Sequence, residues 1–228
     1  METLTYLKRA VKLTLRKFMD YARYTPFCKK GTHSSLIYKI HLEQPILPSA
    51  SFEEKLYNLK YAAEKVEEYI ILPKEVFSFW EIVGNPNKLK GSRCIRNNKV
   101  TIEKGGGLCQ IASVLYNLAL IGGLYIVERY HHSIDLYGDG PRACPLGLDA
   151  TVSYGYKDLR IQNTTNAVLH FYIYIKDNKL CGELQSNIPL VERKIEILKE
   201  VHSDYIHSKT MYAGSGELIA DNIYKKLS

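Results

Sequence analysis

Residues 105–120, which read GGGLCQIASVLYNLAL, decide how this chain folds. From 108 to 120 the side chains are apolar on almost every side of a helix. The polar residues Gln110, Ser113 and Asn117 are spaced by three and four, so they share one helical face. A helix that is apolar on most sides belongs inside a protein. We therefore predict a buried helix over 108–120 that starts after three glycines and ends at the glycine pair 122–123.

Cys109 falls in the first turn of this predicted helix. The unpaired amides and the positive dipole end of a first turn stabilise an anion, and they lower the pKa of a cysteine placed there. Gly106 and Gly107 allow left-handed turns and leave amide N–H groups uncovered for the oxyanion of an acyl-transfer intermediate. Gln110 could add a donor. The alternative is an ordinary turn followed by a small buried thiol.

Beyond the glycine pair the hydrophobic period changes from helical to alternating, which predicts strands. We expect them over 124–129, 132–137, 149–154, 158–162, 168–175, 179–184 and 194–201. The clearest turns between them are at 163–166 and 177–178. A buried helix followed by an antiparallel meander indicates the α+β class.

The chain before 105 supplies two more helices and connecting segments. Residues 3–24 form an apolar stripe at three- and four-residue steps, with many Lys and Arg on the remaining positions. Such a helix could lie on an anionic membrane surface, or it could pack on the body of the protein with a solvated basic face. The stripe consists of Leu4, Leu7, Val11, Leu15, Phe18 and Ala22.

A second helix is expected from Ser51, which forms an S-x-x-E capping box with Glu54. The run VFSFW at 76–80 predicts a buried strand. We divide the chain into a basic helix and connector (1–49), a central domain (50–187), and a C-terminal strand with a loose tail (188–228). Because we find no long apolar span and no signal-peptide core, we expect the protein in the cytoplasm or against the inner face of the membrane.

Composition limits the function classes. With 46% hydrophobic and 24% charged residues the chain is not disordered. A net charge of +7 suits an anionic partner such as a wall polymer or a lipid surface, whereas no nucleic-acid-binding motif is present. The cysteines are odd in number and form no C-x-x-C, which argues against a disulfide framework. They are Cys28, Cys94, Cys109, Cys144 and Cys181.

A thiol nucleophile needs a base and a group that orients the base. On a strand over 132–137, His132 would share a face with apolar residues and point at the helix, whereas His131 would face solvent. Asp149 on the next strand could orient His132, and Asp135 is its rival. Arg129 and Trp80 could line the cleft, with Arg129 holding a substrate carboxylate.

A metal site built from Cys109, Cys144 and the two histidines fits no usual zinc spacing, so we expect neither a metal nor a cofactor. The order of a cysteine at a helix start, then a histidine, then an aspartate is the layout of transglutaminase-like and papain-like thiol enzymes. This similarity is an analogy of layout alone.

Four segments together resemble the VanW family. They are VFSFWEIVGNP (76–86), KVTIEKGGGLCQIASVLYNLAL (99–120), VERYHHS (127–133) and PLGLDATVSYGYKDLRIQNTTN (145–166). The resemblance covers roughly residues 50–185. The resemblance implies a role linked to glycopeptide resistance in Gram-positive bacteria. Some members of this family act as L,D-transpeptidases on peptidoglycan through a catalytic cysteine, and the resemblance implies the same chemistry here. By this resemblance the cysteine is Cys109, and His132 and Asp149 match family positions.

We therefore expect cysteine-dependent acyl transfer, by transpeptidation or amide hydrolysis, on peptidoglycan stem peptides or related peptides. The alternative is a non-catalytic accessory protein of the cell wall that binds wall peptides or the membrane surface.

Overall fold

Helix α4 (Leu108–Ile121) forms the centre of the core. Every residue from Gln110 to Leu120 is buried, whereas Cys109 near its start is partly exposed. Gly107 precedes the helix in the left-handed conformation, with φ at +94°, and Gly122 follows its end. The apolar sequence thus produces the buried helix that its periodicity indicates.

The computed structural model describes residues 2–32, 35–96, 99–135, 137–138 and 140–226. The other helices are α1 (Glu2–Ala22), α2 (Phe52–Glu67), α3 (Phe79–Val83) and the short 3-10 helix η1 (Pro86–Lys88). The strands before α4 are β1 (Lys29–Lys30), β2 (Tyr38–Pro45), β3 (Tyr69–Ile71), β4 (Val76–Ser78), β5 (Gly91–Arg96) and β6 (Lys99–Lys104). Those after it are β7 (Tyr125–Glu128), β8 (Ile134–Asp135), β9 (Arg160–Gln162), β10 (Leu169–Lys176), β11 (Lys179–Ser186), β12 (Ile195–Val201), β13 (Tyr205–Tyr212) and β14 (Leu218–Lys226).

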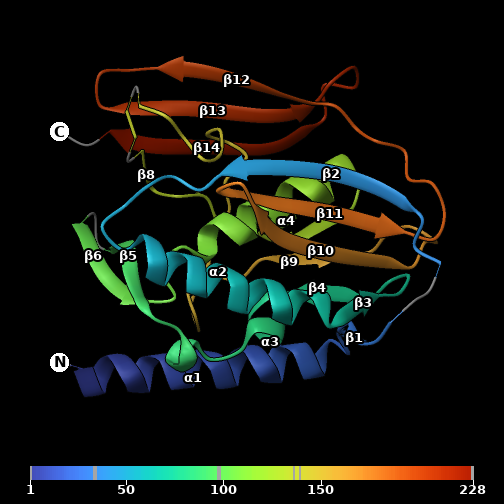
Figure 1. The fold of residues 1–228 in the computed structure, drawn as a ribbon, viewed down its shortest axis with the longest axis horizontal. Helices are drawn as coiled ribbons and strands as arrows, with labels where there is room; N and C mark the ends of the chain where they lie inside the picture. Colours follow the sequence, from blue (N-terminus) through green and yellow to red (C-terminus); the bar gives the residue numbers. More distant parts are fainter. Residues whose placement is uncertain (1, 33–34, 97–98, 136, 139, 227–228) are drawn as a thin grey trace.

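In the described part of the chain the strands form four sheets, and α1 lies along one edge of the molecule (Figure 1). The largest has the order β1-β3-β10-β11-β2, and α4 packs on its β11 and β2 while α2 packs on its β10. A second sheet, β12-β13-β14-β8, is antiparallel except for the parallel pair β14–β8. The others are β4-β9-β7 and the ribbon β5-β6. The predicted α+β class with antiparallel sheets is confirmed.

The predicted meander is wrong, although one of its hairpins is present. Asp177 and Asn178 both have positive φ and join β10 to β11, as a tight hairpin turn requires. The outer neighbours of this hairpin are β3 and β2, which come from the N-terminal part of the chain. Alternating apolar residues identify strands but not their partners, so sequence order did not give sheet order.

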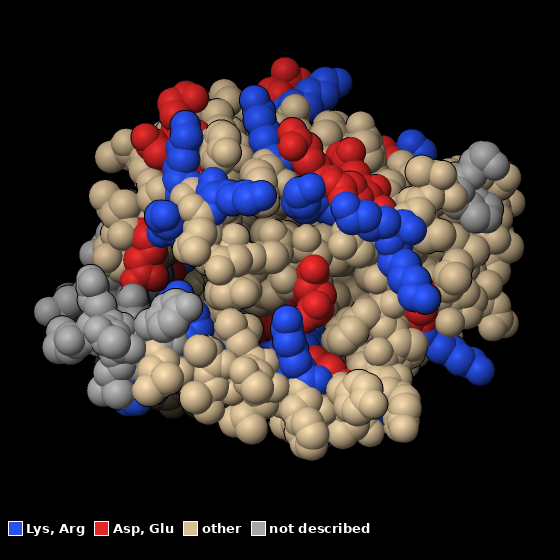
Figure 2. All heavy atoms as spheres, turned by 90° about the horizontal axis from the view of Figure 1, so that it is seen from below, with Lys and Arg blue, Asp and Glu red and all other residues tan. Residues whose placement is uncertain are grey.

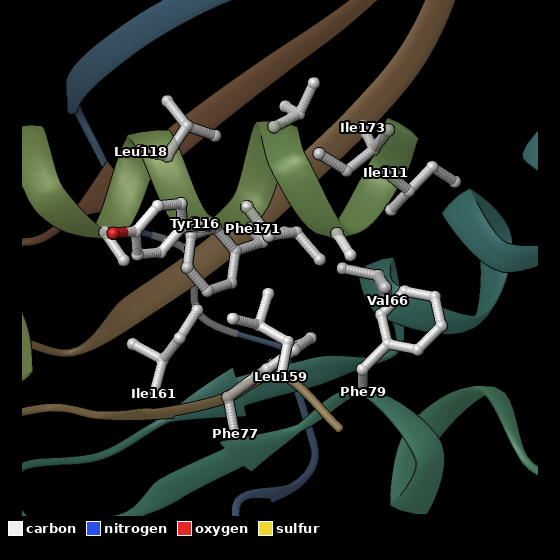
Figure 3. Close-up of a cluster of buried hydrophobic side chains, with 14 of the residues drawn as sticks. Val66, Phe77, Phe79, Ile111, Tyr116, Leu118, Leu159, Ile161, Phe171 and Ile173 are labelled. Atoms are coloured by element: carbon white, nitrogen blue, oxygen red, sulfur yellow. The ribbon is translucent and has the colours of Figure 1, made fainter. Parts of the chain in front are cut away.

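The core lies between the large sheet and the β4-β9-β7 sheet (Figure 3). Phe77 on β4 meets Phe171 on β10 edge to face, with 5.4 Å between ring centroids. Tyr116 on α4 and Leu159 beside β9 fill the space next to these rings, and all four side chains are buried. This packing fixes α4 and therefore the position of its first turn.

Several predicted elements differ in the structure. Residues 149–154 contain no strand, and within 132–137 only Ile134–Asp135 is extended; Leu136 lies outside the described residues. The run 76–80 is a strand that turns into α3. Ser51 does stand at the start of α2, but its side chain makes no capping bond; its Oγ lies 3.0 Å from the Oγ of Ser92.

The C-terminal tail also differs, because it forms the long strands β13 and β14 in place of a loose segment. Its sequence is rich in polar residues, but Ser208, Thr210 and Asn222 are buried, so the strand pattern was masked by polar side chains that bond inside the protein. In the part of the chain that the structure describes, no helix is both long and apolar enough to cross a membrane.

Candidate active site

Cys109, His132 and Asp149 meet at the start of α4, although only Cys109 belongs to a helix or strand. The Sγ of Cys109 donates to the carbonyl oxygen of Val152 at 3.8 Å, and its side chain is close enough to that of His132 for each group to shift the pKa of the other. The Nδ1 of His132 lies 2.6 Å from Oδ2 of Asp149. The three groups thus form a continuous relay from thiol to imidazole to carboxylate, which is the arrangement that an activated nucleophile needs.

The polar face of α4 positions the segment that carries Asp149. The Oγ of Ser113 accepts a hydrogen bond from the amide of Ala150 at 2.9 Å and donates to the carbonyl of Cys109 at 2.8 Å. The Nδ2 of Asn117 donates to the carbonyl of Leu148 at 2.7 Å. These polar side chains on an apolar helix therefore hold the loop at a fixed place beside Cys109.

Asp149 is buried and accepts bonds from several directions. Besides His132, its carboxylate accepts from the hydroxyl of Tyr224 at 2.5 Å and contacts the guanidinium of Arg129 at 3.2 Å. Burial alone raises the pKa of this carboxyl, but its bond to His132 and the charges of His132 and Arg129 outweigh that effect and lower it. Asp149 is therefore ionised at neutral pH and stabilises a positive imidazole.

The pKa values of Cys109 and His132 shift in opposite directions. Burial raises the pKa of the Cys109 thiol, but the hydrogen bond and charge of His132 lower it below the ordinary value. For His132, burial lowers the pKa, yet the bonds to Asp149 and Cys109 raise it to about 10. Together the two shifts favour a thiolate beside an imidazolium.

Other thiols in the core behave differently. Burial raises the pKa of Cys28 and of Cys144 to about 12 in each case, so both stay protonated. Cys109 is the site where burial is offset by a cationic partner. This contrast makes Cys109 the candidate nucleophile among these three thiols.

The amides at the start of α4 show which donors could face an oxyanion. The amides of Gly106, Leu108 and Gln110 donate to backbone carbonyls within the turn. Among the described residues, the amides of Gly107 and Cys109 have no acceptor. The predicted set of donors therefore narrows to these two N–H groups.

Gly106 and Gly107 have separate structural reasons to be glycine. A Cβ on Gly106 would lie 2.4 Å from the carbonyl oxygen of Ser92, so the turn packs directly on the β5 backbone. Gly107 has a positive φ, which side chains disfavour, and a Cβ there would meet the Cγ of Lys55 at 2.7 Å. The glycines therefore build the turn as well as exposing its amides.

The other residues predicted to contact the substrate are Gln110, Arg129 and Trp80. The first two are hydrogen-bonded to other parts of the protein, and the third lines a cleft elsewhere. Gln110 is buried, and its Nε2 donates to the carbonyl of Pro45 at 2.9 Å. The guanidinium of Arg129 is buried, and its Nε donates to the carbonyl of Asp149 at 2.7 Å, so its donors serve the site loop in place of a substrate carboxylate. Trp80 lines a cleft of about 220 Å³ beside α1 and Tyr154, and the described lining residues do not include Cys109.

The alternatives to the predicted trio are occupied elsewhere. Asp135 forms an ion pair with Arg142, whose Nη2 lies 2.6 Å from Oδ2, and this pair is not part of the relay. The ring of His131 packs edge to face on Tyr224. Among the residues that the structure describes, no group of three or more His, Cys, Asp or Glu side chains could hold a metal ion.

Comparisons with known proteins agree with the four motif segments. A family profile described as "VanW like protein" matches residues 54–185. The chain belongs to the VanW family. It is 29% identical over 180 residues to the vancomycin B-type resistance protein VanW of Enterococcus faecalis, covering 73% of this chain and 66% of that protein. It is 34% identical over 121 residues to YoaR of Bacillus subtilis, described as uncharacterized, covering 52% of this chain and 38% of that protein.

No solved structure matches this VanW family chain. The chain spans about two thirds of the length of the Enterococcus relative and less than half of the Bacillus one. The matched region 54–185 contains Cys109, His132 and Asp149. It ends before β14, which brings Tyr224 to the site.

Sequence reasoning missed two supports of this VanW-type site. Tyr224 comes from β14, in a tail that reads as loose, and no local signal links it to Asp149. Asn222 on the same strand accepts from Nη1 of Arg129 at 2.6 Å. The spacing of Ser113 and Asn117 on an otherwise apolar helix was a usable signal, because buried polar side chains need specific partners.

Proposed function

We propose that this protein is a cysteine-dependent acyl-transfer enzyme. The observation that carries the proposal is the relay of Cys109, His132 and Asp149, in which His132 lies between a thiol of lowered pKa and a buried carboxylate that is hydrogen-bonded to its Nδ1. Such a constellation activates a thiol for attack on a carbonyl carbon. We also propose that the order of cysteine, histidine and aspartate serves the same roles here as the similar layout of papain-like and transglutaminase-like enzymes.

In the proposed reaction the Cys109 thiolate forms a C–S bond with the carbonyl carbon of a substrate amide. The resulting oxyanion would accept hydrogen bonds from the amides of Gly107 and Cys109, which have no acceptor among the described residues. The C–N bond then breaks, and the His132 imidazolium gives its proton to the leaving amine, which leaves a thioester. A second amine or water attacks the thioester, passes its proton to His132 and releases the thiolate.

Peptidoglycan stem peptides or related peptides are the proposed substrates. The Enterococcus relative is named as a vancomycin resistance protein, and the resemblance to the VanW family implies action on peptidoglycan. Transfer to an amine would make this an L,D-transpeptidase-like reaction, and transfer to water an amide hydrolysis. The net charge of +7 suits an anionic wall polymer.

The test measures the alkylation rate of each cysteine by iodoacetamide between about pH 5 and 8, followed by mass spectrometry. We expect Cys109 to react at pH 6 at least tenfold faster than Cys28 and Cys144, which serve as internal controls. In His132→Gln this advantage should disappear. If Cys109 reacts no faster than the controls, the enzyme proposal fails and the non-catalytic accessory role is favoured.

A further inference from the structure

Helix α1 presents its apolar face to solvent rather than to the body of the protein. Leu7, Val11, Leu15 and Phe18 are exposed by 60%, 50%, 56% and 66%. These residues belong to the apolar stripe seen in the sequence; the side chain of Leu4 lies outside the described ones. A helix packed on its own domain normally buries this stripe. Helix α1 does lie on the body of the protein with exposed lysines, as one of the two sequence-based alternatives expects, but the face that it turns to the body is not the apolar stripe.

The opposite face of α1 is held to the body by ion pairs. Arg16 donates two bonds to the carboxylate of Glu128, at 2.6 and 2.9 Å. Asp20 accepts two bonds from Arg160, at 2.6 and 2.8 Å, and Arg160 also contacts Asp158 at 3.1 Å. Paired, bidentate contacts fix orientation as well as position. Turning the apolar stripe inward would break both pairs, so its outward orientation is built into the fold.

Basic side chains border the exposed stripe. Lys8, Lys17 and, just after the helix, Arg23 are exposed; Lys12 is exposed too, with its Nζ over the ring of Tyr156 at 4.7 Å. Asp20, the acidic residue within the described side chains of α1, is paired with Arg160. Figure 2 views the molecule from the side of α1, where Lys and Arg side chains and a broad uncharged area share the surface with several Asp and Glu side chains. An apolar strip with cationic flanks matches acyl chains next to anionic headgroups.

We propose that α1 docks this protein on the surface of an anionic phospholipid bilayer, with Leu7, Val11, Leu15 and Phe18 entering the interface. The proposal goes beyond the acyl-transfer function and does not depend on Cys109. A second copy of the chain fits this surface less well. Two α1 helices facing each other would bring their flanking cations together without acidic partners, whereas anionic lipid attracts each of them.

Sedimentation of the full chain with vesicles tests the proposal. Vesicles of phosphatidylglycerol and phosphatidylcholine are compared with vesicles of phosphatidylcholine alone. We expect at least tenfold stronger binding to the anionic vesicles, and a large loss of that difference in 0.5 M salt because exposed charges are screened. The double variant Leu15→Gln, Phe18→Gln should bind at least tenfold more weakly, because it removes apolar area from the interface while keeping helix propensity.

A matched control keeps the result specific. Leu198 and Val201 on β12 are exposed by 57% and 69%, so Leu198→Gln, Val201→Gln removes a similar kind of surface from another face and should leave vesicle binding unchanged. Lys8→Gln, Lys17→Gln should weaken binding to anionic vesicles only. Circular dichroism melting verifies that each variant is folded.

Three outcomes would overturn the proposal. They are no binding to either vesicle, equal loss in the α1 and β12 variants, and a lipid-free dimer in light scattering that the α1 variant abolishes. The last result would assign the apolar face to a second copy. Vesicle binding by Cys109→Ser at the unaltered level separates this proposal from the acyl-transfer one.

Discussion

Removing one hydroxyl from the C-terminal sheet should destabilise the protein through the candidate site. In Tyr224→Phe the carboxylate of Asp149 loses a 2.5 Å hydrogen bond, and the amide of Gly147 loses its acceptor at 2.8 Å. A bond to a charged group contributes about 1.5–3 kcal/mol, and an unsatisfied buried donor costs about 1–3 kcal/mol. Because Tyr224 is fully buried, water cannot replace the hydroxyl without rearrangement. The expected loss in the free energy of unfolding is about 3–5 kcal/mol.

Urea denaturation and calorimetry measure this loss. For a chain of this length the melting temperature should fall on the order of 10 °C. The control is Tyr212→Phe, whose hydroxyl donates to a neutral carbonyl, that of Leu120, at 3.3 Å. It should cost about 0.5–1.5 kcal/mol, the usual net value of a neutral hydrogen bond. Equal losses in the two variants would refute the reasoning that Asp149 depends on a charge-assisted bond from β14.

Further predictions concern the turn, the ion pairs and pH. In urea denaturation Gly106→Ala should lower the free energy of unfolding by about 3 kcal/mol and Gly107→Ala by about 1–2 kcal/mol. The new Cβ at 106 would collide with the backbone of Ser92, whereas the new Cβ at 107 would meet the flexible side chain of Lys55 and force alanine into a positive φ. Arg129→Gln should destabilise the fold by about 3–5 kcal/mol and also slow the alkylation of Cys109, because Arg129 pairs with Asp149. Arg142→Gln should destabilise the fold without changing this alkylation rate, because its partner Asp135 lies outside the relay. The rate of acyl transfer should decline as pH rises through about 10, the raised pKa of His132. Above that pH the imidazole is neutral and has no proton to give to the leaving amine.

The position of the candidate site could be predicted largely from local sequence. The apolar helix, the glycines before it and the candidate nucleophile Cys109 are one continuous segment, and their properties follow from helix periodicity and from the chemistry of a helix start. The choice of His132 over His131 agrees with the geometry, but the reason given for it was wrong. Neither residue belongs to a strand, and the side chain of His132 is oriented by Asp149.

The environment of Asp149 could not be predicted, because its partners come from distant parts of the chain. A carboxylate preceding apolar residues in sequence is consistent with a turn, a strand start or a site residue. Only the packing of β14 against the loop brings Tyr224 and Asn222 to Asp149 and Arg129. Arg129 shows the same limit, since a strand arginine reads as a surface or substrate contact until its buried acceptors are known.

The sequence by itself determined the buried helix, the α+β class, the family and the amphipathic character of residues 3–24, because each depends on the order of residues along a short stretch. The tertiary structure decided which strands pair, which groups surround Asp149 and which way the N-terminal helix faces. Periodicity predicts that a helix has an apolar face, but it does not state what that face meets. Here Glu128 and Arg160 on the body of the protein pair with Arg16 and Asp20 of the helix. The ion pairs therefore face the body, and the apolar stripe faces solvent.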